Sequence, residues 1–96
     1  MAIVRAFEAK GWTPAQYDEL MKHLVNRLGL ADGQAAPGVL FHWAAVTDDG
    51  IRAVDVYESR EAADVLVAET IGPIAGELQL ALPEITELEV HNYLTT

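Results

Sequence analysis

The alternation of apolar and polar positions along the chain predicts four strands and two helical regions. Residues Ala2 to Glu8 alternate loosely and are rich in Ile, Val and Phe, which is typical of a strand. The stretch from Val39 to Glu58 reads as two strands joined by a tight turn, and Ile85 to Leu94 reads as a final strand. Apolar residues recur at helical spacing in the two intervening regions. The predicted order is therefore strand, helix, strand, strand, helix, strand.

The first helix has clear boundaries in the sequence. Thr13 is the expected N-cap, Pro14 occupies the first helical position, and Gln16 completes a capping box. Gly29 is expected to end the helix, and Leu30 to Gly38, which mixes Gly, Pro and small residues, is predicted to be a loop. The face turned toward the core is expected to carry Tyr17, Leu20, Met21, Leu24 and Leu28.

The second helical region is predicted to begin after Glu58 or Ser59. We expect Gly72-Pro73 to interrupt it, because proline removes a helical hydrogen bond. One or two further turns are expected between Ile74 and Leu80, before a break at Leu82-Pro83.

The turn of the hairpin decides which side chains share a face of the sheet. A two-residue Asp49-Gly50 turn suits the left-handed conformations of a tight hairpin and pairs His42 with Tyr57. His42, Asp55 and Tyr57 then lie on one face. A turn one residue longer would pair His42 with Val56 and send Asp55 to the opposite face, since a one-residue slip inverts a strand's side chains.

The two faces of the hairpin are expected to have different neighbours. The face expected to lie under the helices carries Val39, Phe41, Trp43, Ala45, Val54 and Val56. The face with the polar residues also carries Leu40, Ala44, Val46, Ile51 and Ala53. Soluble monomers rarely expose such an apolar face to water, so a second sheet should cover it.

The order of elements is that of a ferredoxin-like α+β fold, βαββαβ, whose four-stranded antiparallel sheet has both helices on one face. At 96 residues the chain is expected to form one domain, residues 1–96. Because the uncovered face of the sheet is apolar, we expect a homodimer formed through the sheet faces.

Composition narrows the classes of partner. Six basic and fifteen acidic residues give a formal net charge of -9, which repels nucleic acid and acidic membrane surfaces. The chain has no cysteine, which excludes disulfides, thiolate nucleophiles, iron–sulfur clusters and Cys-ligated zinc. The N-terminal segment carries Arg5 and no sustained apolar run, so we expect neither a signal peptide nor a membrane span. A cytoplasmic protein is the default expectation.

Two stretches carry a resemblance to a known family: PGVLFHWAAVTDDGIRAVDVYESREAADVLVAETIGP and the closing VHNYL. With them the chain resembles the dimeric α/β barrel superfamily, especially small bacterial antibiotic-biosynthesis-monooxygenase-like proteins. The resemblance implies two ferredoxin-like subunits packed sheet against sheet. It also implies a small-molecule cavity between sheet and helices or near the interface. Related members include cofactor-free monooxygenases, polyketide cyclases, haem-degrading enzymes, isomerases and proteins without known activity.

Three hairpin residues are the candidate catalytic group. Imidazole side chains titrate near neutral pH, so His42 is a candidate general base, with Asp55 and Tyr57 orienting the imidazole or the substrate. The alternative is a structural histidine bonded to Tyr57 or to backbone. A carboxylate in mid-strand needs a partner, and the candidates for Asp55 are Arg52, Arg5, His42 or a ligand.

Trp43, His91 and Tyr93 are the candidate ligand-binding residues. For Trp43 the alternative is an ordinary core position, and for His91 and Tyr93 it is a solvated edge or a dimer-contact strand. Trp12 is interpreted as a lid over a pocket or as a hydrophobic staple against the first helix. His42, His91 and Asp55 could form a two-histidine, one-carboxylate iron site, but nothing in their spacing requires them to be close, so no metal is predicted. No cofactor is predicted either.

The leading hypothesis is a small-molecule-binding protein or cofactor-independent monooxygenase-like enzyme. Its substrate would be an apolar aromatic or polyketide-like compound, deprotonated by His42. The alternative is a non-catalytic dimeric module, either a ligand carrier or a component of a larger assembly, whose polar residues are structural.

Overall fold

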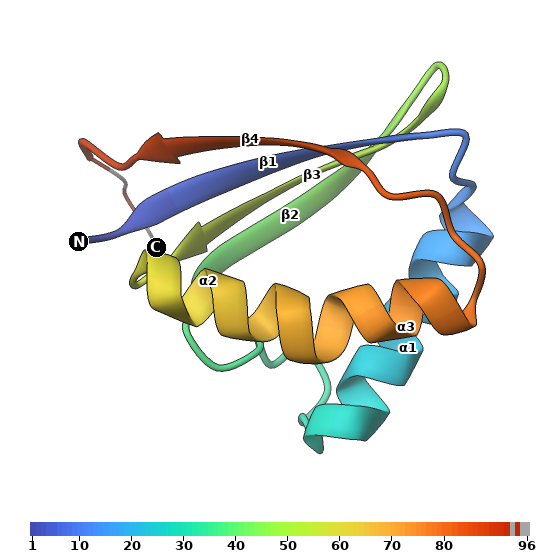
Figure 1. Cartoon of the computed structure of the whole chain (residues 1–96), viewed down its shortest axis with the longest axis horizontal. Helices are drawn as coiled ribbons and strands as arrows, with labels where there is room; N and C mark the ends of the chain where they lie inside the picture. The colour runs from blue at the N-terminus through green and yellow to red at the C-terminus, as the bar shows by residue number, and fades with distance from the viewer. Residues whose placement is uncertain (93, 95–96) are drawn as a thin grey trace.

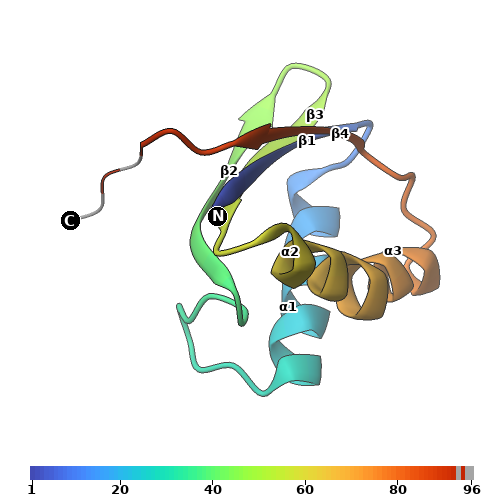
Figure 2. The same cartoon turned by 60° about the vertical axis from the view of Figure 1, so that its left-hand side comes forward.

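The computed structural model describes residues 1–92 and 94, which form a four-stranded antiparallel sheet with helices on one face (Figure 1). The strand order is β2-β3-β1-β4. The strands are β1 (Ile3–Lys10), β2 (Val39–Thr47), β3 (Gly50–Tyr57) and β4 (Glu84–Glu89). The helices α1 (Pro14–Leu28), α2 (Arg60–Leu66) and α3 (Gly72–Glu77) lie together below the sheet in both views (Figure 2). The predicted ferredoxin-like α+β fold is confirmed.

The ends of α1 follow the local sequence. The Thr13 hydroxyl accepts a hydrogen bond from the Gln16 backbone N–H at 3.2 Å, and the Gln16 side chain accepts one from the Thr13 N–H at 2.8 Å. Gly29 ends the helix in the left-handed conformation, with φ of 65°. The predicted capping box and C-terminal glycine are both confirmed, because these signals depend only on neighbouring residues.

The second helical region is continuous, contrary to the predicted interruption at Gly72-Pro73. Ser59 caps α2, and a π-helical turn, η1 (Val67–Ile71), joins α2 directly to α3. In this turn the Gly72 N–H donates to the Val67 carbonyl oxygen. Pro73 directly follows this π-helical turn, where the wider backbone already departs from the regular i→i−4 hydrogen bonds that a proline would interrupt. A side chain at Gly72 would place its Cβ 2.9 Å from the Val67 oxygen, so the turn requires glycine there.

The hairpin turn is Asp48-Asp49, not the predicted Asp49-Gly50. Gly50 instead belongs to β3, where a Cβ would lie 2.2 Å from the carbonyl oxygen of Ala9 in β1. This close approach explains the glycine, which has no role in the turn itself. The register moves by two residues, so His42 pairs with Asp55 and not with Tyr57.

The predicted assignment of the two sheet faces is wrong. A shift of two residues keeps His42, Asp55 and Tyr57 on one face, but the helices cover that face. Tyr57 is fully buried there and Asp55 is nearly so. A bulge between Val39 and Phe41 also turns Val39 toward the helices. The buried cluster between sheet and helices comprises Ile3, Leu20, Leu24, Ala36, Tyr57, Ala63, Leu66, Ile74 and Ala75.

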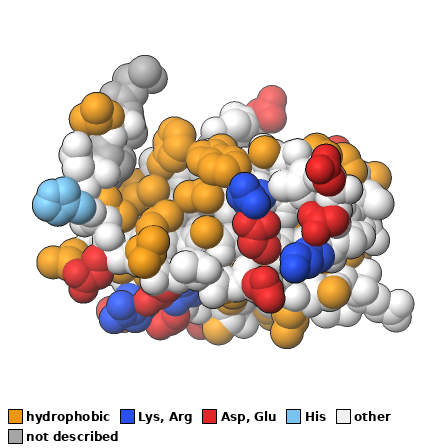
Figure 3. Space-filling view, turned by 90° about the horizontal axis from the view of Figure 1, so that it is seen from above, with side chains coloured by type: hydrophobic (Ala, Val, Ile, Leu, Met, Phe, Trp, Pro, Cys, Tyr) orange, Lys and Arg blue, Asp and Glu red, His pale blue; other side chains and the backbone are white. Residues whose placement is uncertain are grey.

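The other sheet face, which we call the open face, has no helix over it. Apolar side chains gather on this side of the molecule, as Figure 3 shows in orange. Phe41, Trp43 and Leu88 are 44%, 40% and 62% exposed. Pairing in the sheet places Val4, Ala6 and Val54 on the same face. The open face is apolar, as the dimer prediction requires, but its hairpin residues Phe41, Trp43 and Val54 had been expected under the helices.

The first and last strands differ from prediction at their ends. β1 begins and ends later than the predicted Ala2 to Glu8, and β4 is shorter than the predicted Ile85 to Leu94. His91 follows the end of β4 and is exposed. Tyr93 lies outside the described residues.

Each helix in the described part of the chain is too short or too polar to cross a lipid bilayer.

Candidate active site

Four side chains form a continuous chain of hydrogen bonds between α1 and the sheet. The Tyr17 hydroxyl lies 2.6 Å from Nε2 of His42. Nδ1 of the same imidazole bonds to Oδ1 of Asp55, its partner across the β2–β3 pair. The Tyr57 hydroxyl donates to the second oxygen of Asp55 at 2.7 Å. We call Tyr17, His42, Asp55 and Tyr57 the relay.

The relay fixes the proton positions on the imidazole. An ionised carboxylate only accepts hydrogen bonds, so with neutral His42 the Nδ1 atom carries the proton and donates it to Asp55. Nε2 is then a lone-pair acceptor for the Tyr17 hydroxyl. This assignment follows from the hydrogen-bond partners. It places a base at Nε2, with a carboxylate on the opposite side of the ring to stabilise a developing positive charge.

Burial keeps the two tyrosines of the relay protonated. Removal from water, followed by the nearby charge of Asp55, raises the pKa of Tyr17 from 10.0 to about 12. Burial also raises the pKa of Tyr57, and the charge and hydrogen bond of Asp55 raise it further. Both phenols therefore stay hydrogen-bond donors at physiological pH.

A cavity of about 710 Å³ lies between the sheet and the helices, beside three members of the relay. Its size falls in the range of roughly 300–1,000 Å³ that is typical of small-molecule sites. Tyr17, His42 and Asp55 line it, whereas Tyr57 is buried behind Asp55. Most of the remaining wall is apolar and includes Phe7, Ala9, Trp12, Leu20, Met21, Leu24, Val39, Ile51, Ala53, Leu66, Val67, Ile71, Ala75, Leu82 and Ile85.

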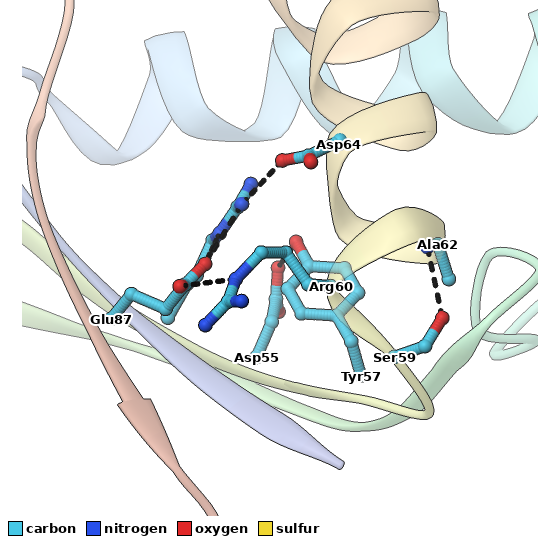
Figure 4. A network of polar contacts seen from close by, with 8 residues as sticks. Asp55, Tyr57, Ser59, Arg60, Ala62, Asp64 and Glu87 are labelled. Atoms are coloured by element: carbon cyan, nitrogen blue, oxygen red, sulfur yellow. Dashed lines mark hydrogen bonds and ion pairs between the residues drawn. The ribbon is translucent and has the colours of Figure 1, made fainter. Parts of the chain in front are cut away.

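A charge network around Glu87 of β4 lies next to Asp55 and Tyr57 (Figure 4). The carboxylate of Glu87 accepts from Nε of Arg5 at 2.9 Å and from Nε of Arg60 at 2.8 Å, and Arg5 also donates to Asp64 at 2.5 Å. The hydrogen bonds from Arg60 and Arg5 lower the pKa of Glu87. Arg5 is thereby bonded to carboxylates other than Asp55.

Arg52, another candidate partner of Asp55, bonds to Glu8 at 2.5 Å. Of the three protein partners suggested by the sequence, His42 is therefore the one that bonds to Asp55. The mid-strand carboxylate of Asp55 is thus held by an imidazole and a phenol.

The ligand-binding candidates do not gather around the cavity. Trp43 lies on the open face, away from the cavity, because it neighbours His42 on an alternating strand. His91 is exposed beyond β4, and Tyr93 lies outside the described residues. Within residues 1–92 and 94, no three His, Asp or Glu side chains are grouped so as to hold a metal ion.

Tyr17 is the site residue that the sequence reasoning missed. It had been assigned to the apolar stripe of the first helix, and it does lie on the inward face. The available signal was its hydroxyl, since a buried tyrosine usually needs a hydrogen-bond partner.

Comparisons with known proteins place the fold among solved structures. No protein-family model matches the chain, and no curated protein matches it in sequence. A proposed antibiotic biosynthesis monooxygenase from Chloroflexus aurantiacus is similar, with 20% identity and a TM-score of 0.66 over 99% of this chain and 98% of that one. SnoaB, a cofactor-independent oxygenase from Streptomyces nogalater, has 17% identity and a TM-score of 0.61 over 99% and 96%. NE2512, a protein of unknown function from Nitrosomonas europaea, has 19% identity and a TM-score of 0.57 over 99% and 92%.

These likenesses span nearly the full length of each chain and establish a shared fold. The chain has the ferredoxin-like fold of antibiotic-biosynthesis-monooxygenase-like proteins, which confirms at the level of the fold the resemblance found in its sequence.

Proposed function

We propose that the protein is a cofactor-independent monooxygenase-like enzyme acting on an apolar aromatic substrate with an acidic C–H or phenolic O–H. The observation that carries the proposal is the exposure of the relay to an otherwise apolar cavity, with a base at Nε2 of His42. The fold shared with a protein described as a cofactor-independent oxygenase supports it.

Proton removal is the first step of the proposed reaction. Nε2 of His42 accepts the proton from the substrate carbon or hydroxyl, and Asp55 stabilises the resulting imidazolium. The Tyr17 hydroxyl, released from Nε2, donates instead to the substrate oxygen on which negative charge develops. Tyr57 holds the second oxygen of Asp55, which keeps the imidazole in position.

Oxygen then completes the reaction without an added reductant. The carbanion forms a C–O bond with O2, giving a peroxide anion, and this anion takes up the proton from the imidazolium to become a hydroperoxide. Loss of water from the hydroperoxide leaves a carbonyl. A methylene group and O2 thus become a ketone and water, and the substrate itself supplies all the electrons.

The open face supports a further part of the proposal, a homodimer. Exposed Phe41, Trp43 and Leu88 lie together with Val54 on a sheet face without helices. Soluble monomers rarely expose a large contiguous apolar patch, and two-fold pairing of two such faces would remove it from water.

Oxidation of 1,8-dihydroxyanthrone tests the catalytic proposal, because this compound has an acidic methylene between aromatic rings. We expect the protein to raise oxygen uptake and quinone formation above the spontaneous rate, and His42→Ala to abolish most of that increase. His23→Ala is the matched control, since His23 lies on the exposed side of α1 beside Glu19. A rate equal to that of buffer, or equal rates in the wild type and His42→Ala, would refute the proposal.

A further inference from the structure

Trp12 lies outside the relay, but it borders the same cavity from the connection between β1 and α1. Its side chain is partly buried against the core cluster and lines the cavity. Its indole Nε1–H donates to the carbonyl oxygen of Ala81 at 2.9 Å. This bond joins two connections that are 69 positions apart in the sequence.

The segment held by this bond also forms part of the cavity wall. Leu82 and Pro83, which directly follow Ala81, both line the cavity. Leu82 is 84% exposed, so little packing holds its side chain in place. The indole bond therefore fixes the backbone next to an otherwise weakly held part of the wall.

The cavity wall also includes three large aromatic side chains. Phe7, Trp12 and Tyr17 come from three successive parts of the chain, β1, the connection and α1, and all three line the cavity. Aromatic rings attract one another beyond simple burial, in offset or edge-to-face arrangements. The described lining contains neither Lys nor Arg, and Asp55 contributes a carboxylate, so a neutral ligand fits better than an anionic one.

We propose that Trp12 is a ligand-contacting residue that controls the affinity and release of neutral planar aromatic ligands. Its ring forms one boundary of the cavity, and its N–H bond holds Ala81 to Pro83 against the bound molecule. The inference rests on the proposal that the cavity takes a small molecule, but not on any reaction at His42.

Binding of neutral 1-aminoanthracene to the protein of residues 1–96 provides the test, and the increase in probe fluorescence measures it. Trp12→Phe keeps one aromatic ring but removes the N–H donor, and we expect the Kd to rise about 5- to 10-fold, mainly through faster release. Trp43→Phe is the matched control, because the other tryptophan of the chain lies on the open face. Its Kd should stay within about 2-fold of the wild-type value.

Wild-type protein supplies a second measurement that does not depend on the folding of a variant. The indole N–H signals of the two tryptophans can be assigned by nuclear magnetic resonance through Trp43→Phe. We expect the Trp12 signal to move during the probe titration while the Trp43 signal stays in place. Movement of the Trp43 signal alone, absence of probe binding, or a Trp12→Phe Kd within 2-fold of wild type would overturn the inference.

The two proposals fail in different ways. Probe binding that depends on Trp12 without turnover of 1,8-dihydroxyanthrone would support the role of Trp12 and refute the oxygenase. Turnover that depends on His42, with a Kd unaffected by Trp12→Phe, would refute the role of Trp12 alone.

Discussion

The Tyr17 hydroxyl lies 2.6 Å from Nε2 of His42 and joins the first turn of α1 to an edge strand of the sheet. The two residues are 25 positions apart in the chain, and their rings are nearly parallel, with an interplanar angle of 5°. This contact connects the relay to the cavity, because both residues line the cavity wall. The same hydrogen bond engages Nε2 of His42, which is the atom that acts as the base in the proposed reaction.

His42→Ala is expected to lower turnover of 1,8-dihydroxyanthrone by about 100-fold or more, since general-base catalysis contributes at least that much. The variant should still fold, although Asp55 loses one of its two partners and stability falls by about 1–3 kcal/mol. Initial rates and urea unfolding would be measured on the same preparation. A large loss of stability with full turnover in the remaining folded protein would make His42 a structural residue.

Asp55→Asn tests whether the carboxylate sets the state of the imidazole. The amide oxygen can accept from Tyr57, but the amide NH2 facing His42 is a donor and favours the tautomer with the proton on Nε2. Turnover should therefore fall by about 100-fold. The structure bonds Asp55 to no arginine, so no positive charge is stranded and the stability loss should stay near 1–2 kcal/mol.

Two measurements separate these effects. The imidazole tautomer can be read from the 15N shifts of His42, and stability from the melting temperature. Unchanged 15N shifts in Asp55→Asn, or a collapse in melting temperature with unaltered ligand affinity, would contradict the tautomer argument.

The raised pKa of Tyr17 predicts that the free energy of unfolding falls in alkaline solution. Its pKa is about 12 in the folded protein against an ordinary value of 10.0, so the unfolded chain loses this proton first as pH rises. The contribution of Tyr17 is therefore complete below pH 10 and is lost as pH rises toward about 12. Tyr57 also has a raised pKa, so Tyr17→Phe should show a shallower decline and not a flat profile. Urea unfolding of both proteins from about pH 8 to 11.5 checks this, and parallel profiles would exclude a role for Tyr17.

A charged side chain introduced on the open face is expected to break the proposed homodimer. Trp43→Glu should convert the proposed homodimer to monomer, because the carboxylate would lie unpaired between two apolar sheets. Asn26→Glu adds the same charge on the exposed side of α1 and should leave the dimer intact. Light scattering at micromolar concentration distinguishes the two outcomes. A monomeric wild-type protein would end the dimer proposal.

Because the helices cover the sheet face that carries Asp55, substitutions on that face do not test the proposed dimer interface. A charge at Ala53, which would have tested the interface under the predicted face assignment, falls in the cavity wall instead. Its neighbour across the hairpin, Ala44, lies on the same side of the sheet.

The sequence by itself determined the features that depend on neighbouring residues. The capping residues around α1, Gly29 at its end and the alternation in the strands each act over a few positions, and together they define the βαββαβ order. The common face of Asp55 and Tyr57 also follows from alternation alone, whereas His42 shares that face because the actual register differs from the predicted one by an even number of residues.

Tertiary structure decided which face the helices cover. Both faces of the hairpin are apolar, so alternation separates two sets of residues without saying which set is inside. Gly50 pairs with Thr47 across the hairpin and approaches the Ala9 backbone in β1, so the reason for this glycine is a contact between two strands distant in the chain. The bonds of Tyr17 to His42 and of Trp12 to Ala81 likewise depend on how the helices and connections pack across the sheet. Local sequence patterns do not specify such long-range contacts, because they exist only once separate elements have been brought together.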